Sequence, residues 1–465
     1  MRLRSLLVCS SFAIMALPVS AQQPSRAALL SRIDSLATGF LSATHTPAVS
    51  VAVLRGADTL VMKGYGDASI GARRAATAST VYRIGSITKQ FTSAAIMRLA
   101  ERGKLSIDDP MSKYLPDVPT HGRTITIRRL LNHTSGVHNY TAEAAWRPRW
   151  AEDMTPREIV AFVDHDSLDF TPGDAWSYSN TGYVLLGMII EKVTGEPYAT
   201  YLQHDLFTPL GLRQTSYCPS RPTDPSFADG YSSQGGTVKP AEFLSMTQPF
   251  SAGALCSTVR DLVIWQRALA GGRVVNANSY ALMTTPDTLN DGKRLTYGFG
   301  LSVGRLGAHR SIGHSGGVNG FTTASMYFPD DSVNVAVFSN SDRGPDPLAL
   351  NIARAVFGMP LVAAPKPLVA VPLSDVDRDR LVGVYDLTPS GGGKFVIHIF
   401  VENGQLMTEA EGKGQGKFPL VHVGNLQFRA AFDPSLRLTF ISENGKITKV
   451  RLEQGGGTME GVPRR

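Results

Sequence analysis

Apolar residues recur at two different spacings along the chain, and the change of spacing predicts where strands and helices lie. Residues 47–66, PAVSVAVLRGADTLVMKGYG, hold two β-branched apolar runs around a polar turn at 55–58, which predicts a hairpin near the start of a sheet. Residues 86–105, SITKQFTSAAIMRLAERGKL, carry apolar side chains at helical spacing and are closed by Gly103. This segment is expected to form a largely buried helix with Ser86 in its first turn.

The same patterns predict three more elements further along the chain. A second helix is expected over about 181–193, where Gly195 stops it. Residues 311–340 alternate apolar and polar positions, which predicts two strands joined by a turn at 329–331. A last helix is expected over PLALNIARAVFG, residues 347–358.

The last hundred residues have a different character. Residues 359–375, MPLVAAPKPLVAVPLSD, are rich in Pro, Ala and Val without periodicity, which is typical of a linker. Beyond them, short alternating runs are separated by glycine and asparagine turns. We therefore expect a main domain at 22–360, a linker at 361–375 and a small antiparallel β-barrel-like domain at 376–465.

The first residues predict export. Arg2 and Arg4 precede an apolar run that ends with the small-residue pattern Val19-Ser20-Ala21, which is typical of a signal peptide, residues 1–21, cleaved after Ala21. The apolar run is shorter than the roughly 18 residues that a membrane-spanning helix needs. A periplasmic or secreted protein without stable membrane insertion is expected.

Composition and charge exclude some classes of partner. The chain has 465 residues, of which 43% are hydrophobic and 18% charged, as in ordinary globular proteins with room for two domains. Its formal charge of +7 falls to +5 when Arg2 and Arg4 leave with the signal peptide. Because this charge is dilute and no basic run is interleaved with aromatic residues, nucleic acid is not an expected partner.

Cysteine and histidine positions bear on disulfides and metals. Loss of the signal peptide leaves Cys218 and Cys256, an even pair in an oxidising compartment. Sequence does not give their separation, so a disulfide and two buried thiols are both open. His133 and His138 are the closest pair of histidines, but no carboxylate or thiol stands at ligand spacing. Neither a metal nor another cofactor is expected.

Residues 313–317, GHSGG, match the G-x-S-x-G pattern of a nucleophile elbow, which would make Ser315 the nucleophile of an α/β-hydrolase. That elbow requires a helix directly after the serine, whereas VNGFTTASMYF alternates like a strand. The later histidines, His398 and His422, fall in the separate tail. The elbow is therefore the weaker of two hypotheses.

Ser86 and Lys89 form the second candidate, a Ser-x-x-Lys pair. At positions i and i+3 they share one face of a helix. The helix N-terminus and burial both lower the pKa of such a lysine, and a neutral amine can accept the serine proton. The short motif is weak alone, because an N-capping serine followed by a surface lysine looks the same.

Two further triplets, Tyr178-Ser179-Asn180 before a helix and His314-Ser315-Gly316 on a strand, follow Ser86-x-x-Lys89 in the chain. In this order the motifs resemble the serine β-lactamase and penicillin-binding protein superfamily. The resemblance points to its class C-like branch, which includes β-lactamases, D-Ala-D-Ala carboxypeptidases, D-aminopeptidases and esterases. It covers roughly residues 48–358 and extends to the phrases VYRIGSITKQFT, ITIRRLLNHTSGV, SAGALCSTVRDL and YGFGL.

This resemblance implies a fold and a set of roles. The fold is α/β (α+β), an antiparallel sheet flanked by helices with an all-α subdomain, and the tail resembles small lipocalin-like modules. Ser86 forms an acyl-enzyme while Lys89 and Tyr178 share its proton, and which of these two is the base stays open. The backbone N–H groups of Ser86 and Gly317 form the oxyanion hole. The residues expected to bind substrate are Asn180, His314, Ser315 and Gly316, with Asn180 on the substrate amide.

Departures from the family pattern narrow the function. His314 stands where β-lactamases usually have lysine, so a fixed positive charge for a ligand carboxylate is missing. We expect an exported serine hydrolase that acts on amide or ester carbonyls of D-amino-acid peptide, ester or β-lactam type, with a small molecule or peptide as substrate. The alternatives are a β-lactamase proper and a non-catalytic sensor of cell-wall fragments or penicillin. A lapsed enzyme would be expected to lose Ser86, Lys89 or Tyr178, and all three are present.

Overall fold

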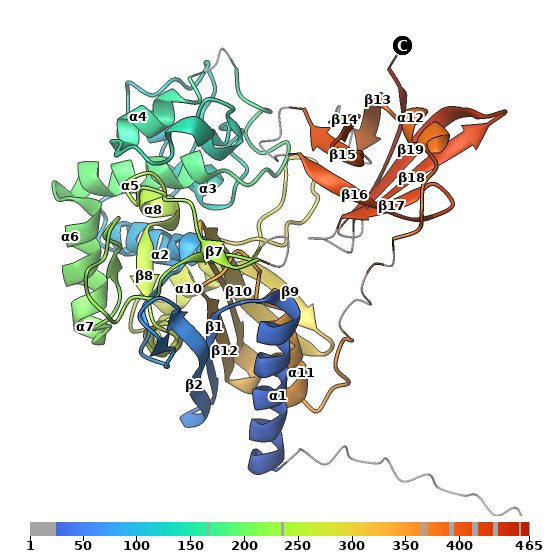
Figure 1. Ribbon diagram of the computed structural model, residues 1–465. Helices are drawn as coiled ribbons and strands as arrows, with labels where there is room; N and C mark the ends of the chain where they lie inside the picture. Colours follow the sequence, from blue (N-terminus) through green and yellow to red (C-terminus); the bar gives the residue numbers. More distant parts are fainter. Residues whose placement is uncertain are drawn as a thin grey trace, which may run out of the picture.

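The computed structural model describes residues 25–164, 167–233, 237–363, 368, 370–389, 395–411, 417–430, 436–454 and 457–464. Figure 1 shows a larger α/β body and a smaller barrel that follows it in the chain. The expected signal peptide at 1–21 lies outside the described residues.

A seven-stranded antiparallel sheet forms the centre of the larger body, in the order β3-β2-β1-β12-β11-β10-β9. The hairpin expected at 47–66 is confirmed as the first two of these strands. Strands β10, β11 and β12 pair in succession, and β12 pairs with β1 at the centre of the sheet. The bounds are β1 Ala48–Arg55, β2 Asp58–Ser69, β3 Arg74–Ala75, β9 Ser302–Leu306, β10 His309–Val318, β11 Phe321–Phe328 and β12 Val333–Ser339.

The expectation of only two strands at 311–340 is wrong, because the segment forms β10, β11 and β12. The expected turn is present as a short 3-10 helix at Pro329–Asp331. An additional turn separates β10 from β11 at Asn319 and Gly320, where Gly320 has a φ of +78°. Asn-Gly favours such tight hairpins because both residues tolerate left-handed backbone. Apolar and polar residues alternate both before and after Asn319 and Gly320, so the pattern alone does not reveal this turn.

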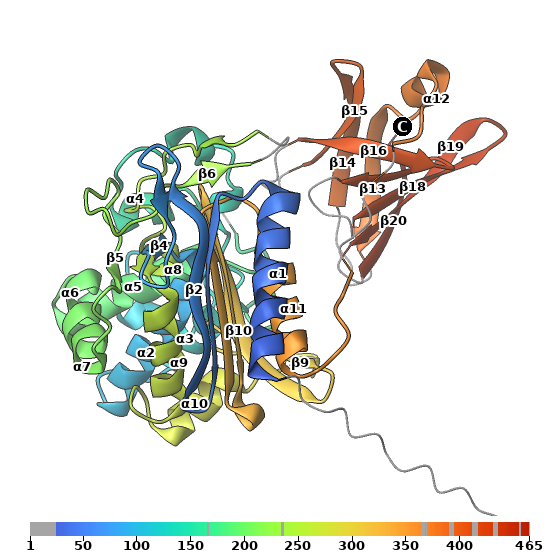
Figure 2. The same ribbon diagram turned by 60° about the horizontal axis from the view of Figure 1, so that its bottom comes forward.

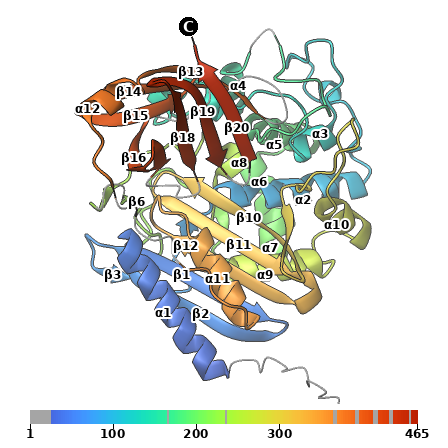
Figure 3. The same ribbon diagram turned by 90° about the vertical axis from the view of Figure 1, so that its right-hand side faces the viewer.

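Helices cover both faces of this sheet, which explains why its central strands are apolar on both sides. Val49, Val51 and Val53 of β1 pack toward α1 (Arg26–Thr44) and α11 (Asp346–Val356) on one face. Ala52 and the opposite face of β12 pack toward α9 (Val259–Ala270). Figures 2 and 3 show α1 and α11 side by side along one face of the sheet.

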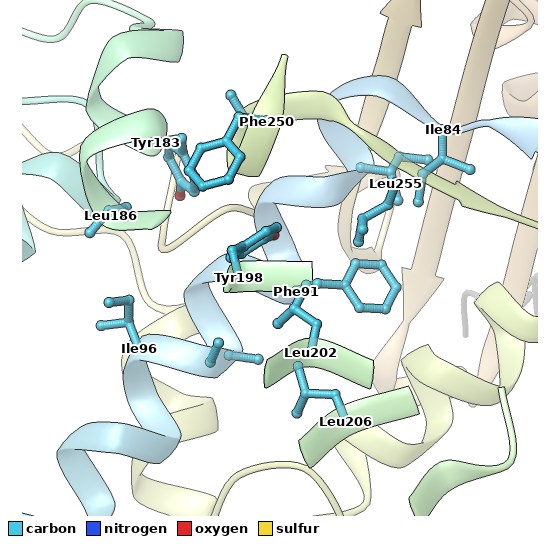
Figure 4. Packing of buried hydrophobic residues seen from close by; sticks show 14 of the residues in the cluster. Ile84, Phe91, Ile96, Tyr183, Leu186, Tyr198, Leu202, Leu206, Phe250 and Leu255 are labelled. Atoms are coloured by element: carbon cyan, nitrogen blue, oxygen red, sulfur yellow. The ribbon is translucent and has the colours of Figure 1, made fainter. Parts of the chain in front are cut away.

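Most of the remaining helices form a second group beside the sheet, built around α2 (Thr88–Glu101) and α5 (Asn180–Thr194), which lie close to the expected ranges, whereas α12 (Asp375–Asp379) lies at the barrel (Figure 1). Phe91 of α2 stacks on Trp265 with ring centroids 4.0 Å apart. Figure 4 shows side chains of α2, α5, α6 and the α8–β8 segment gathered in this core. The other helices are α3 Ile127–Leu131, α4 Pro156–Ala161, α6 Tyr198–Leu202, α7 Thr208–Leu210, α8 Phe250–Gly253, α10 Ala277–Thr284 and α12 Asp375–Asp379.

Cys218 and Cys256 form a disulfide in this structure, with Cα atoms 5.1 Å apart. The bond lies at a small three-stranded sheet in the order β4-β8-β5. Of the two possibilities that the sequence left open, the structure therefore has the disulfide. The short strands outside the main sheet are β4 Tyr82–Arg83, β5 Ser216–Tyr217, β6 Tyr231–Ser232, β7 Lys239–Pro240 and β8 Leu255–Ser257.

The tail forms a closed antiparallel barrel, which agrees with the small β domain expected there. The described residues of 359–374 lie in no helix or strand. Aromatic and aliphatic side chains such as Tyr385, Phe428 and Phe440 fill the barrel interior. Its strands are β13 Gly383–Pro389, β14 Phe395–Glu402, β15 Gln405–Ala410, β16 Phe418–Gly424, β17 Gln427–Ala430, β18 Arg437–Glu443, β19 Lys446–Gln454 and β20 Gly457–Pro463.

None of the helices in the described part of the chain combines the length and apolar character that crossing a bilayer requires. The exact limits of the two domains and the linker stay predictions.

Candidate active site

Ser86 lies in a 3-10 turn, Gly85–Ile87, directly before α2 rather than inside the helix. Gly85 adopts a φ of +51°, which glycine tolerates without strain. A Cβ atom at Gly85 would lie 2.6 Å from the backbone nitrogen of Gly317, so only glycine permits this approach. The turn that carries Ser86 is thus held against β10.

Lys89, in the first turn of α2, lies beside Ser86. Its Nζ is 3.1 Å from Ser86 Oγ, 2.8 Å from Asn180 Oδ1 and 2.8 Å from the backbone oxygen of Ala252. The side chain has no exposed surface. Burial lowers the pKa of Lys89 well below its ordinary value of 10.5, because the charged ammonium loses its water.

The three partners of Lys89 differ in what they can do. Asn180 Oδ1 and the Ala252 carbonyl can only accept hydrogen bonds, whereas the Ser86 hydroxyl can also donate one. A neutral amine has two N–H groups for these two acceptors and one lone pair for the hydroxyl proton. An ammonium could donate to all three oxygens, and a neutral amine could donate to two of them while its lone pair accepts the Ser86 proton; burial favours the neutral form.

Tyr178 lies next to this pair, as its motif suggested. Lys89 Nζ is 4.7 Å from the centre of the Tyr178 ring. The ring of the buried His133 also packs against Tyr178, with the two ring centres 4.4 Å apart. Burial raises the pKa of the Tyr178 hydroxyl, and the nearby Ser86 opposes this only in part. Within the described residues the buried hydroxyl has no hydrogen bond of good geometry. An unpaired buried donor calls for an explanation, and a reacting group beside it would supply one.

Asn180 begins α5, where the Ser179 side chain caps the helix by accepting from the Gly182 N–H. Its Oδ1 accepts from Lys89, and its Nδ2 makes longer bonds of 3.3 Å to Asn139 and Thr141. Asn180 therefore lies at the site, but its side-chain oxygen already accepts a hydrogen bond from Lys89. Binding of a substrate amide by Asn180 stays a prediction.

His314 lies on β10 with both ring nitrogens occupied. Its Nδ1 contacts the carbonyl oxygen of Ser315, which can only accept, so Nδ1 carries the hydrogen. Nε2 is then the acceptor for the Tyr297 hydroxyl at 2.8 Å. Burial and the neighbouring Lys89 amine lower the pKa of His314 to about 4. The imidazole is therefore neutral at physiological pH and brings no positive charge to the site.

Ser315 follows on the exposed side of β10, and its hydroxyl is already engaged. Ser315 Oγ donates to Asp346 Oδ1 at 2.7 Å, and Asp346 is the first residue of α11. Burial raises the pKa of Asp346, and the bond from Ser315 opposes that shift. The chain continues after Ser315 into β11 and not into a helix, so the nucleophile-elbow geometry is absent.

Sequence reasoning missed two residues of this arrangement, Asp346 and Tyr297. Asp346 stands just before the helix expected at 347–358, where an acidic residue ordinarily signals only a helix start. Tyr297 belongs to the phrase YGFGL, whose resemblance to the family implies no role for the tyrosine.

Gly316 fixes the distance between β10 and the segment before Ser86. A Cβ atom there would lie 2.0 Å from the Ile84 carbonyl oxygen and 2.5 Å from Thr323 Oγ1. The same carbonyl accepts from Thr323 Oγ1 at 3.0 Å. The backbone of β10 therefore contacts the nucleophile turn directly and leaves no room for a side chain.

Gly316→Ala is accordingly expected to destabilise the protein by about 1–3 kcal/mol, as overpacking does in other cores, and to reduce acylation of Ser86. Gly317→Ala is the matched control, because its nearest neighbour would be Thr322 Cγ2 at 4.0 Å. Thermal unfolding of both variants checks the prediction. A Gly316→Ala variant as stable as Gly317→Ala would show that the contact between β10 and the segment before Ser86 leaves room for a side chain.

Metal ligands do not gather in the described part of the chain, where no group of three or more His, Cys, Asp and Glu residues could hold an ion. His138, part of the histidine pair noted above, instead pairs with Asp169 at 2.6 Å.

Comparison with known proteins gives the family. The model of the family described as Beta-lactamase matches residues 33–358, which is most of the chain, so the protein belongs to that family. It is a serine hydrolase of the β-lactamase family.

Individual relatives agree with this assignment. Penicillin-binding protein 4* of Bacillus subtilis (strain 168) is 29% identical over 311 residues, which cover 63% of this chain and 68% of the relative. The octameric penicillin-binding protein homologue from Pyrococcus abyssi is 26% identical, with a TM-score of 0.66 over 93% of this chain and 99% of that one. The D-stereospecific amidohydrolase from Streptomyces sp. is 30% identical, with a TM-score of 0.61 over 72% of this chain and 99% of that one.

Proposed function

We propose that the protein is an exported hydrolase that forms an acyl-enzyme on Ser86 and acts on amide or ester carbonyls of D-amino-acid type. One observation carries this proposal: among the described residues, the Ser86 hydroxyl is the one partner of the buried Lys89 amine that can give up a proton. The Ser315 hydroxyl instead donates to the Asp346 carboxylate, and the chain after it continues into β11 without the helix that a nucleophile elbow requires.

In the proposed reaction Lys89 takes the proton from Ser86 as Oγ attacks the substrate carbonyl. The backbone N–H groups of Ser86 and Gly317 stabilise the negative oxygen of the tetrahedral intermediate, and the close approach of Gly85 to Gly317 supports their pairing. The Tyr178 hydroxyl then passes a proton to the leaving group while Lys89 returns the one it holds to Tyr178. Water attacks the acyl-enzyme by the reverse route and regenerates Ser86.

The D-amino-acid preference rests on the relatives. Among the solved structures similar to this chain, one is a D-stereospecific amidohydrolase and another is the D-amino acid amidase from Ochrobactrum anthropi SV3. Export rests on the residues at 1–21, and the disulfide between Cys218 and Cys256 fits an oxidising compartment. Asn180, His314, Ser315 and Gly316 are proposed to line the substrate site.

A β-lactamase proper is less well supported. Its ligands carry a carboxylate, and the position of the usual lysine is taken by a neutral His314. A non-catalytic sensor has no need for a desolvated lysine aimed at a serine, because a buried amine costs stability.

A fluorophosphonate probe tests the proposal without knowledge of the substrate, because it phosphonylates an activated serine. The intact mass should rise by one adduct, and peptide mapping should place it on Ser86 in the wild type and nowhere in Ser86→Ala. An adduct on Ser315 would overturn the proposal in favour of the elbow. Incubation with penicillin on the same samples then reports whether β-lactams acylate Ser86 and how fast the adduct clears.

A further inference from the structure

The hydrogen bond between Ser315 and Asp346 decides what Ser315 can offer to a substrate. Asp346 is a carboxylate acceptor at 2.7 Å, so the Ser315 hydroxyl proton points toward it. The hydroxyl therefore presents lone pairs to the site rather than a hydrogen. A substrate group that meets this position must donate hydrogen bonds.

The charged groups around Asp346 also leave room for a substrate cation at its carboxylate. In the described part of the chain Asp346 takes part in no ion pair that would neutralise it. The nearest cation in sequence, Arg343, donates from its guanidinium to the Ser233 carbonyl oxygen at 3.2 Å. His314 is neutral with both nitrogens occupied, and Lys89 is enclosed by its own three partners. Among these groups, therefore, none forms an ion pair with the Asp346 carboxylate.

We infer that Asp346 and Ser315 together form a subsite for a substrate ammonium, so that the enzyme selects cationic substrates and discriminates against those with a free carboxylate. This inference rests on the proposed function, because it assumes acylation at Ser86. An ammonium has N–H donors for both the Ser315 oxygen and the Asp346 carboxylate, which makes the bonds charge-assisted. A substrate carboxylate would meet a like charge and lone pairs at the same place.

The ammonium can belong to either half of the substrate. On the acyl side it is the free amino group of an amino acid amide or ester, and on the other side it is a cationic leaving group. Two pairs of compounds separate these sources. D-alanine 4-nitroanilide and isobutyric acid 4-nitroanilide differ by an ammonium against a methyl group on the acyl side. 4-(Aminomethyl)phenyl acetate and 4-ethylphenyl acetate differ by a primary ammonium against a methyl group in the leaving phenol.

The readout is the ratio of kcat/KM between the cationic and the neutral member of each pair at pH 7, below the ordinary α-amino pKa of about 7.7–8.0. In the wild type the ratio should exceed one for at least one pair, and Asp346→Asn should lower that ratio roughly tenfold or more, as expected for a bond to a charged group. Asp58→Asn, which removes an exposed carboxylate in the β1–β2 turn, is the matched control and should keep the wild-type ratio. Ser315→Ala retains the carboxylate and should keep a ratio above one.

Equal ratios in the wild type and in Asp346→Asn would overturn the inference, and so would a wild type that prefers the neutral member of both pairs. These outcomes differ from failure of the proposed function, in which the neutral members would be hydrolysed equally well by Ser86→Ala. Thermal unfolding of Asp346→Asn verifies that the variant is folded when the ratios are compared.

Discussion

Ser86→Ala is expected to abolish turnover of every amide and ester substrate, whereas Ser315→Ala is expected mainly to raise KM. In the described part of the chain Lys89 makes a hydrogen bond to no hydroxyl but that of Ser86, so the loss of Ser86 removes both the nucleophile and the proton that the base would accept. Removing a nucleophile ordinarily lowers kcat by about 10³-fold or more. Ser315 contacts Asp346 instead, and its loss changes a binding group.

Steady-state kinetics of both variants on one chromogenic ester measure this difference. Loss of a binding interaction used equally by substrate and transition state leaves kcat nearly unchanged, so the two parameters separate the roles. Equal losses of kcat in both variants would contradict the assignment of Ser86. Circular dichroism on the same preparations verifies that each variant retains the fold.

The parts of this site that could be predicted are those encoded over short distances in the chain. Ser86 and Lys89 are three residues apart at the start of one helix, so helical geometry alone brings them together. The hairpin at 47–66 followed from β-branched runs around a turn, which depend on neighbouring residues only. Tyr178, Asn180 and His314 could be placed only because their motifs resemble a family, and the structure does bring them around Lys89.

The parts that could not be predicted depend on distant contacts. Asp346 reaches Ser315 across 31 residues, and nothing around it distinguishes a substrate group from a helix-starting acid. The disulfide joins cysteines 38 residues apart, a separation that fixes no distance in space. The helix α1 escaped prediction because only Leu29, Ile33 and Ala37 are buried along its 19 residues, too narrow a stripe to give a clear period.

Lys89→Met is expected to remove acylation of Ser86, because methionine fills much of the space of the lysine but accepts no proton. General-base catalysis is ordinarily worth about 10²–10⁴-fold, and kcat/KM should fall by at least that factor. In the wild type kcat/KM should also fall as the pH drops through the lowered pKa of Lys89, where the amine becomes charged. Stopped-flow acylation by an activated ester across a pH series measures both effects, and near-normal acylation by Lys89→Met would assign the base to Tyr178.

The same substitution should change how stability depends on pH. Because burial lowers the pKa of Lys89 in the folded state, the unfolded chain binds more protons between that lowered pKa and the ordinary value of 10.5. Wild-type stability therefore gains with rising pH across this window relative to Lys89→Met, and the gain is absent below it. Urea unfolding at several pH values measures the difference, with Lys104→Met, at an exposed lysine just after α2, as control. If the free energy of unfolding of Lys89→Met and of Lys104→Met differed from the wild type by amounts that do not change with pH, Lys89 would be charged in the folded enzyme. A charged Lys89 could not take the proton from Ser86.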